Sequence, residues 1–384
     1  MEVKPGYKQT EVGVIPEEWE VKTLGEIGGV RMCKRVLKHQ TRENGEVPFY
    51  KIGTFGDVAD AFITQSLFDE YRRKYSFPRR GDVLISAAGT IGRTVVYDGA
   101  PAYFQDSNIV WIANDESKAT NAYLWHRYQV TKWSVSHGGT VARLYNDNLS
   151  TKIHIPIPPL PEQRAIATAL SDVDGLLGGL DRLIAKKRDL KQAAMQQLLT
   201  GQTRLPGFHG EWEVTRLGDV LQIKKGQLIT SSTLMPGDIP VIAGGKQPAY
   251  YHASANRFGR TVTISASGAS AGYVAHYDEP IFASDCSTIS ESESYCLDFI
   301  FYQLLYKQQT IYKAQTGGAQ PHIHAKDLNP ILFMFPPIPE QTAIASVLTA
   351  MDAELAALTQ RREKTRALKQ AMMQELLTGR TRLV

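Results

Sequence analysis

The chain of 384 residues repeats part of its own sequence, and this repeat constrains the fold more than any other feature. From Pro161 it reads PEQRAIATALSDVDGLLGGLDRLIAKKRDLKQAAMQQLLTGQTRL, and from Pro339 it reads PEQTAIASVLTAMDAELAALTQRREKTRALKQAMMQELLTGRTRL, without a gap. A looser match lies upstream, where EWEVKTLGEI at Glu18 resembles EWEVTRLGDV at Glu211. We therefore expect a tandem duplication in which each copy is a globular half followed by one long helix.

The repeated segments are predicted to be helices of about 40 residues, or roughly 60 Å. Each begins with a proline and a glutamate, which suit a helix N-terminus, and Gly201 and Gly379 stand where a left-handed C-terminal cap is expected. Apolar residues recur at alternating spacings of four and three, which is typical of a coiled coil. In the first copy these are Ile166, Leu170, Val173, Leu177, Leu180 and Ile184, and in the second Ile344, Leu348, Met351, Leu355, Leu358, Leu368, Met372 and Leu376.

Small residues mark the middle of both helices. Gly175, Gly178 and Gly179 in the first copy correspond to three alanines in the second, at 353, 356 and 357. Each glycine costs about 1 kcal/mol in a helix. If the two helices pair antiparallel, these small residues favour a close backbone approach there. The alternative is a tolerated weak spot in the first helix.

The globular halves combine strand and helix patterns. DVLISAA, NIVWIA, TKIHIPIP and TVTISA are typical of short strands, whereas NAYLWHRYQVTKWSV and LDFIFYQLLYKQQTIYKA each predict one amphipathic helix. The expected fold class is α+β, with two duplicated mixed domains and an antiparallel helix pair. We place the segment boundaries at 1–157, 158–205, 206–335 and 336–384.

The chain lacks the sequence signatures of catalysis. It contains no GxxxxGK[ST] phosphate loop and no GxGxxG after a strand, and the cofactor loop of a base methyltransferase is absent. Three widely spaced cysteines favour reduced thiols in the cytoplasm. No apolar run approaches the ~18 residues of a membrane span. We therefore expect a non-enzymatic chain that itself binds no cofactor and no metal.

Local basic clusters point to DNA, although the net charge of +4 does not by itself. RMCKRVLKHQTR contains no acid, and YRRKYSFPRR interleaves cations with aromatic residues. Such clusters suit phosphate contacts, while Arg, Asn and Gln can reach base edges. For any single cluster, a solvated basic face is the alternative. The predicted DNA-binding residues are Arg31, Lys34, Arg35, Lys38, Arg72, Arg73, Lys74, Arg79, Arg80, Arg93, Arg143, Lys224, Lys225, Lys246, Arg257, Arg260, Gln320, His322, His324 and Lys326.

The pattern as a whole resembles the specificity subunit of type I restriction-modification systems. The resemblance rests on the paired helix starts PLPEQ and PIPEQ, the paired ends QQLLTGQTRLPGF and QELLTGRTRL, and the opening GVIPEEWEVKTLGEI. It implies two target recognition domains that each read one half of a split DNA sequence, with the long helices as spacer and docking surface. Because the two recognition segments differ strongly, we expect an asymmetric target.

The implied partners are double-stranded DNA, two modification (methyltransferase) subunits and the restriction (translocase and nuclease) subunits. S-adenosylmethionine, ATP and Mg would then bind those partners. We assign helix pairing and partner docking to Pro161, Glu162, Gln163, Ile166, Leu170, Leu177, Leu180, Leu198, Leu199, Pro339, Glu340, Gln341, Ile344, Leu348, Leu355, Leu358, Leu376 and Leu377. Two alternatives remain, which are a stand-alone DNA-binding regulator and a coiled-coil adaptor.

Overall fold

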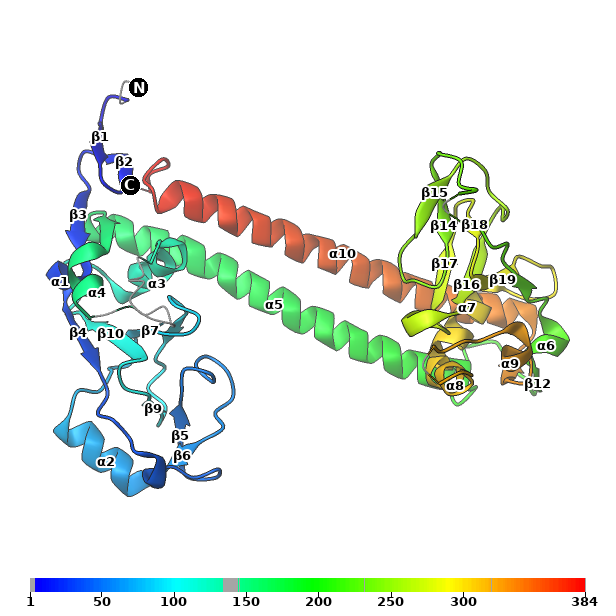
Figure 1. Cartoon of the computed structure of the whole chain (residues 1–384), viewed down its shortest axis with the longest axis horizontal. Coiled ribbons are helices and arrows are strands. Elements are labelled where there is room, and N and C mark those ends of the chain that lie inside the picture. Colours follow the sequence, from blue (N-terminus) through cyan, green and yellow to red (C-terminus); the bar gives the residue numbers. More distant parts are fainter. Residues whose placement is uncertain (1–3, 134–143, 145, 231, 319, 384) are drawn as a thin grey trace. The chain divides into compact units, whose positions relative to one another are not determined.

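The computed structural model describes residues 4–133, 144, 146–230, 232–318 and 320–383. Its contacts divide the chain into two compact units (Figure 1). Unit 1 comprises Met1–Gly179 and Arg362–Val384, and unit 2 comprises Leu180–Arg361. Each unit therefore holds one globular half together with part of each long helix.

Unit 1 contains three sheets besides an N-terminal hairpin. The hairpin is β1 (Tyr7–Thr10) with β2 (Gly13–Pro16). The four-stranded sheet has the order β4 (Gly29–Met32), β10 (Ile109–Ala113), β7 (Val83–Ser86), β8 (Thr94–Val96). A three-stranded sheet has the order β6 (Phe62–Ile63), β5 (Val47–Tyr50), β9 (Tyr103–Phe104). The third sheet is the pair of β3 (Glu20–Thr23) with β11 (His154–Ile157). Its short helices are α1 (Leu24–Ile27), α2 (Gln65–Lys74), α3 (Asn121–Val130) and α4 (Asn146–Lys152).

Unit 2 repeats this plan. Its four-stranded sheet has the order β13 (Lys224–Lys225), β19 (Cys286–Ser290), β16 (Thr261–Ser265), β17 (Val274–Tyr277). A three-stranded sheet has the order β15 (Tyr250–His252), β14 (Ile239–Ile242), β18 (Phe282–Ala283), and β12 (Glu213–Arg216) pairs with β20 (Leu332–Phe335). Its helices are α6 (Leu217–Val220), α7 (Leu297–Tyr306), α8 (Gln308–Lys313) and α9 (Ala325–Leu328).

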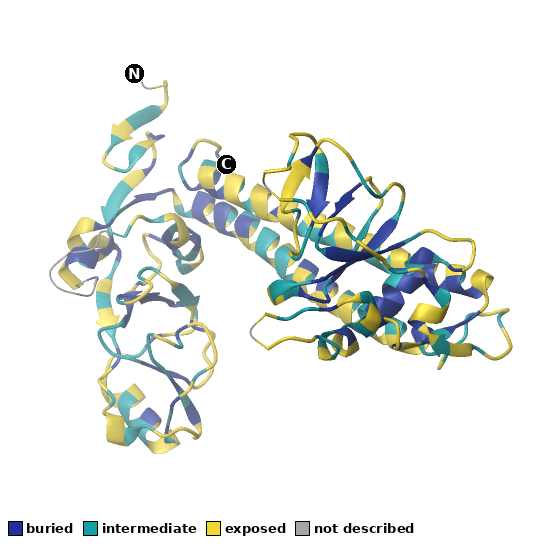
Figure 2. Ribbon diagram, turned by 45° about the vertical axis from the view of Figure 1, so that its right-hand side comes forward, coloured by how far each residue is buried: buried dark blue, intermediate teal, exposed yellow. Residues whose placement is uncertain are grey.

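The two units share strand order as well as sequence. In each three-stranded sheet the central strand is antiparallel to one neighbour and parallel to the other. In each four-stranded sheet the third strand, β7 or β16, is the one that precedes a glycine turn. In unit 2, β16 and its neighbour β19 are buried along nearly their whole length (Figure 2). The predicted duplication of an α+β domain is confirmed.

The long helices are α5 (Leu160–Leu199) and α10 (Ile338–Leu376). Gly201 and Gly379 have φ of 70° and 72°, as expected for C-terminal caps. In unit 1, Asp174 of α5 pairs with Lys369 of α10 at 2.7 Å, and Glu162 near the start of α5 meets Arg382 beyond the end of α10. Position along α10 therefore rises as position along α5 falls, so the helices run antiparallel in this unit.

The same direction holds in unit 2, from ion pairs within that unit alone. Lys187 and Lys191 of α5 contact Glu354 and Asp352 of α10 at 2.7 and 2.5 Å. The apolar faces join the unit cores: Ile166 and Leu170 cluster with Met373 and Leu376 in unit 1, and Leu198 clusters with Ile344 and Leu348 in unit 2.

Leu368 is a wrong prediction, because it is 55% exposed and lies outside the helix seam. The 4,3 spacing continues from Leu358 through Arg362, Thr365 and Lys369, of which Thr365 is buried. The apolar pattern is interrupted by these polar residues, and Leu368 stands one residue away from the true period.

The close backbone approach expected at Gly175, Gly178 and Gly179 stays a prediction, because the matching alanines of α10 belong to unit 2. One further expectation fails. The single helix predicted from residue 297 is two helices, α7 and α8, which are separated at Lys307.

α10 is also long and apolar enough, by length and composition alone, to cross a membrane. The expectation that no apolar run is long enough for a span did not identify this helix, whose apolar residues are mixed with Ser, Thr, Asp and Glu. One such helix is weak evidence for a membrane span. In unit 2 the buried residues Ile344, Ala345 and Leu348 of α10 pack into the hydrophobic core.

Candidate nucleic-acid interface

The two basic runs of the first half meet on the surface of unit 1. Lys34 Nζ, just after β4, lies 5.2 Å from the centre of the Tyr75 ring at the end of α2. Arg31 on β4 and Arg79 before β7 line one cavity of about 460 Å³, together with Trp111. The segments 31–38 and 72–80, which are separate in sequence, therefore form one cationic and aromatic surface.

Helix α2 exposes its basic last turn to solvent, because its N-terminus is capped and its apolar face packs against the domain core. Thr64 caps its N-terminus by accepting a hydrogen bond from the Leu67 backbone N–H at 3.3 Å. Phe68 is buried and meets the Phe77 ring edge-on at 5.5 Å. The cations of the last turn lie at the negative end of the helix dipole, which favours their charge. Arg73 stays exposed.

Several cations of unit 1 already have partners. Arg35 pairs with Asp106 at 2.8 Å and Lys74 with Glu70 at 2.9 Å, whereas Arg93 donates to the Phe55 carbonyl at 2.7 Å. Arg72 lies over the Phe68 and Phe77 rings. An exposed pair such as Lys74–Glu70 is worth at most about 1 kcal/mol, so a phosphate can replace the carboxylate there.

Other cations of unit 1 form no ion pair with any residue that the structure describes. These exposed side chains are Arg31, Lys34, Lys38, Arg73, Arg79 and Arg80. The cavity beside Arg79 also contains Asp82, and burial raises the pKa of its carboxyl group. Arg143 lies outside the described residues.

In unit 2 two of the predicted arginines are held internally. The Arg257 guanidinium donates to Thr288 Oγ1 at 2.8 Å and to the Lys225 carbonyl at 2.9 Å, so it ties β13 to the loop before β16. Lys224 and Lys225 remain exposed on the edge strand β13. Lys246 is also exposed, with Nζ 5.5 Å from the Tyr273 ring centre.

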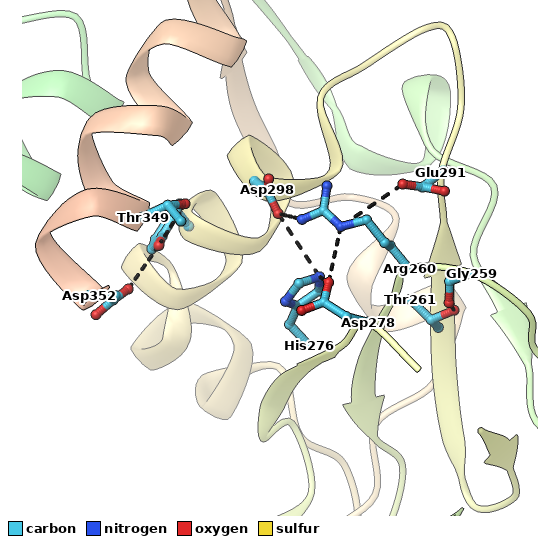
Figure 3. Close-up of polar contacts among 10 residues, drawn as sticks. Gly259, Arg260, Thr261, His276, Asp278, Glu291, Asp298, Thr349 and Asp352 are labelled. Carbon is cyan, nitrogen blue, oxygen red and sulfur yellow. Dashed lines mark hydrogen bonds and ion pairs between the residues drawn. The ribbon is translucent and has the colours of Figure 1, made fainter. Parts of the chain in front are cut away.

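Arg260 is surrounded by carboxylates (Figure 3). It pairs with Asp278 at 3.1 Å, with Asp298 at the start of α7, and more distantly with Glu291 at 4.0 Å. Burial lowers the pKa of Arg260, but hydrogen bonds with Asp298 and Asp278 outweigh burial, and the net pKa is raised. Because three acids neutralise this guanidinium, its environment repels a phosphate. We leave Arg260 out of the proposed phosphate contacts.

The polar loop of unit 2 packs against the glycine turn at residues 267–272. The Gly268 N–H donates to the Pro321 carbonyl at 3.0 Å, and the Ile323 N–H donates to the Ala266 carbonyl at 2.9 Å. In unit 1 the Leu144 N–H donates to the Ala87 carbonyl at 2.8 Å, at the equivalent place. Of the residues predicted to bind DNA, Gln320 and His322 lie in this loop, His324 caps α9 and Lys326 lies in α9; the two histidine rings are stacked at 6.2 Å.

Exposed aromatic residues of unit 2 were missed by the sequence analysis. Tyr250 and Tyr251 on β15 are 45% and 57% exposed, and Phe258 is 75% exposed. Exposed rings can stack on bases or sugars. The consecutive tyrosines in PAYYHASANRFG were the available signal, because an outward ring at two successive strand positions cannot belong to a single buried face.

The glutamates of the two PEQ motifs are buried, which corrects their assignment to partner docking. Glu162 is 1% exposed and accepts hydrogen bonds from Trp19 Nε1 at 2.9 Å and from Arg382 Nε and Nη2 at 2.5 and 2.9 Å. In unit 2, Glu340 accepts in the same way from Trp212 and Arg204. We call each of these two three-residue clusters a Trp–Glu–Arg junction.

The neighbouring glutamines are buried too and cannot contact a partner. Gln163 Oε1 accepts from the Thr120 N–H at 2.8 Å, at the start of α3, and Gln341 Oε1 accepts from the Cys296 N–H at 2.9 Å, at the start of α7. The PEQ motif therefore joins each long helix to a helix of its own globular half.

Most of the other residues assigned to docking are also core residues. Those buried in the unit cores are Ile166, Leu170, Leu180, Leu198, Leu199, Ile344, Leu348, Leu376 and Leu377. Leu177, Leu355 and Leu358 are half-buried, whereas Pro161 and Pro339 are exposed. Burial at these positions is compatible with the predicted role in helix pairing. Direct docking is excluded for the buried ones.

The comparison with protein families decides the relationship. The family model described as the type I restriction modification DNA specificity domain matches residues 16–184 and 209–366. The chain belongs to this family.

Individual relatives agree with the family. A putative type I restriction enzyme specificity subunit of Haemophilus influenzae is 56% identical over 166 residues, which span 43% of each chain. A putative type I restriction enzyme specificity subunit of Methanocaldococcus jannaschii is 26% identical over 98% of this chain and 97% of its own. The crystal structure of the type I restriction-modification S subunit from M. genitalium is 16% identical and superposes with a TM-score of 0.66 over 98% of both chains. The fold is thus that of an S subunit.

Each matched region of this type I specificity chain contains one globular half and most of the long helix that follows it. Each Trp–Glu–Arg junction takes its Trp from the start of a repeat and its Glu from the start of the following long helix. The Arg comes from a TRL motif after the end of a long helix. The motifs that carry the family resemblance therefore meet at the junction in each unit.

Proposed function

We propose that this protein is the DNA-binding specificity subunit of a type I restriction-modification complex, with no catalytic activity of its own. Each recognition half reads one part of a split, asymmetric DNA target. The observation that carries the proposal is the convergence of segments 31–38 and 72–80 into one cationic and aromatic surface, in a chain of the DNA specificity family.

The asymmetry of the target follows from the different surfaces of the two halves. The unit 1 surface offers several arginines beside Trp111 and Tyr75, and a planar guanidinium suits bidentate contacts with guanine. Unit 2 offers exposed tyrosines, a pair of stacked histidines and exposed lysines such as Lys224, Lys225 and Lys246. Different donors and acceptors read different bases, so the two half-sites differ.

The proposed partners are two modification subunits and the restriction subunits, in the cytoplasm. S-adenosylmethionine would bind the modification subunits, and ATP with Mg the restriction subunits. Among the residues that the structure describes, no three His, Cys, Asp or Glu side chains gather as a metal site would require. The helix surfaces left exposed beside the buried seam are the places where we expect the modification subunits to dock.

Methylome sequencing of a host that expresses this chain with its modification subunits tests the function. We expect methylation at one split, non-palindromic motif that disappears when this chain is deleted. DNA binding without any methylation would instead indicate a stand-alone regulator. A complex with the modification subunits that binds all duplexes equally would contradict the role in specificity.

The proposal predicts that Arg73→Ala weakens DNA binding for all sequences and lowers the salt dependence by about one unit of slope. The reason is that an exposed cation beside the aromatic surface, with no described ion pair, is suited to a phosphate. The measurement is the affinity of the assembled complex for its target at several salt concentrations. Arg260→Gln is an informative contrast, because the carboxylates around Arg260 should leave the slope unchanged.

A further inference from the structure

A cavity of about 490 Å³ lies in unit 1 between the β1–β2 hairpin, α3 and the end of α10. Its charged lining consists of Lys4, Arg127 and Arg380, and its described lining includes no carboxylate. Apolar and hydroxyl-bearing side chains such as Ile15, Leu377 and Tyr7 complete the wall. None of these residues belongs to the predicted DNA-binding set.

Arg127 is the unusual member of this lining. Its Nη1 makes one long hydrogen bond, 3.4 Å, to the Leu377 carbonyl, and its Nε is buried without a described partner. Burial lowers the pKa of Arg127, and Tyr123 offsets this only in part. A guanidinium withdrawn from water and left without an anion is costly, so an anion in the cavity would be bound favourably.

The duplication supplies a comparison for this position. The two PEQ glutamines accept hydrogen bonds from Thr120 and Cys296, which are therefore equivalent positions. Arg127 is seven residues beyond Thr120, and Gln303 is seven residues beyond Cys296, so these two residues are equivalent as well. Gln303 Nε2 donates to the Leu199 carbonyl at 2.9 Å and to the Met334 carbonyl at 3.3 Å. A neutral amide therefore satisfies this site in unit 2. A structural role at this position requires no charge, yet unit 1 has a cation.

The surroundings of Arg127 extend the positive charge. Arg127 also borders a second cavity of about 540 Å³, which Lys132 and Lys152 line. The one acid among the described residues of that lining, Glu11, lies 3.5 Å from His154 Nε2. Arg380 lies 3.7 Å from the exposed Glu375, a weak pair that leaves its charge available at the rim.

We propose that the cavity of unit 1 is a binding site for an oxyanion, a phosphate or carboxylate group. The Arg127 guanidinium, which lines the cavity, binds the group through its N–H donors, as guanidinium groups bind oxyanions. Lys4 and Arg380 contact it from the rim, and the apolar wall accommodates the rest of an organic anion.

Calorimetric titration of the full chain with inorganic phosphate, and separately with acetate, at constant ionic strength tests the proposal. We expect saturable binding of one anion per chain, and the tighter of the two identifies the preferred group. Arg127→Gln, which restores the residue of the other repeat, should weaken binding about tenfold or more. Arg380→Gln, a change at an exposed residue that does not threaten folding, should weaken it less. Arg164→Gln, an exposed change on α5 away from the cavity, should have no effect.

Thermal unfolding gives an independent measurement. The preferred anion should raise the Tm of the wild type relative to chloride at the same ionic strength, and should not raise the Tm of Arg127→Gln. The proposal is overturned if neither anion binds saturably, or if Arg127→Gln and Arg380→Gln both bind as the wild type does. The experiment uses neither DNA nor partner subunits, so its outcome is separate from that of the proposed function.

Discussion

Replacing Glu162 by Ala should destabilise unit 1 by about 3 kcal/mol or more, the cost typical of removing one partner from a buried ion pair. The carboxylate is 1% exposed and accepts three hydrogen bonds, from Trp19 and from both Nε and Nη2 of Arg382. Its loss leaves the fully buried Trp19 indole N–H without an acceptor and the Arg382 charge without its main partner. The hydrogen bonds with Glu162 and then Glu18 raise the pKa of Arg382, which shows how strongly this charge depends on them.

Urea unfolding with hydrogen exchange of α3 and α7 would measure the effect in each unit. Glu162→Ala should speed exchange in α3, whereas Glu340→Ala should act on α7, because each glutamate contacts residues of its own unit. Glu363→Gln is the surface control in unit 1. It removes surface ion pairs with Arg362 and Arg366 and should cost less than about 1 kcal/mol. An equally small cost for Glu162→Ala would show that the junction does not hold the unit together.

The duplication and the long helices could be predicted because they are local or repetitive features of the sequence. The repeat is in register without a gap, and the cap glycines Gly201 and Gly379 follow the last helical turn in both copies. The seam could be followed only while its positions were apolar. Thr365 and Lys369 interrupt the apolar pattern, so the spacing led to the exposed Leu368.

The role of the PEQ motif could not be predicted from the sequence alone. Glu162 contacts Trp19 and Arg382, which lie 143 and 220 residues away in the chain. An acid beside a proline at a helix start has an ordinary local explanation, namely the helix dipole. Only the fold reveals that this carboxylate points inward, and hence that it cannot dock a partner.

The sequence could predict which cations belong to the candidate DNA surface. It could not predict which of them are already paired with other groups of the chain. The runs that contain Lys34 and Arg79 were evident, and the structure brings them together. Arg257 and Arg260 looked equally suitable in sequence. Their partners, Thr288 and Asp298, come from distant strands and helices, so their engagement depends on tertiary structure.

A second comparison between the repeats concerns the contact of each globular half with the long helices. In unit 2, Tyr302 donates a hydrogen bond to Asp352 at 2.8 Å and lies 3.3 Å from Thr349 Oγ1, and Lys191 pairs with the same aspartate. In unit 1 the equivalent ring is His126, which is six residues beyond its helix cap, as Tyr302 is.

His126, like Tyr302, faces a hydroxyl residue and an aspartate of a long helix, but it forms fewer hydrogen bonds with them. His126 Nε2 lies 3.1 Å from Ser171 Oγ, while Nδ1 is 4.0 Å from Asp174 Oδ2 and has no described hydrogen-bond partner. Lys369 Nζ pairs with the other oxygen of Asp174. The charged groups that face His126 are thus Asp174 from α5 and Lys369 from α10, and Trp125 lies beside its ring.

Unit 1 should therefore lose stability in mild acid through His126. Burial lowers the pKa of His126 to about 4, against the attraction of Asp174 and with a smaller contribution from Lys369. The unfolded chain takes up this proton near pH 6.5. Between these two values the unfolded state binds more protons than the folded state, so stability falls as the pH falls. The contribution is complete above pH 6.5, and its loss is complete near pH 4, at a cost of roughly 2–4 kcal/mol.

The matched variants come from the repeat. In His126→Tyr the hydroxyl should reach Asp174 and Ser171 as Tyr302 reaches Asp352 and Thr349, and this ring does not titrate below neutral pH. We expect urea unfolding followed by hydrogen exchange of α3 to show a weaker acid dependence in this variant than in the wild type. The reciprocal Tyr302→His should make α7 acid-sensitive. Carboxylates titrate in the same range, but they are common to all three proteins, so the difference between profiles isolates the ring. Identical profiles for the wild type and His126→Tyr between pH 4 and 6.5 would show that the histidine is protonated equally well in the folded state, and that its buried place beside Lys369 does not exclude the proton.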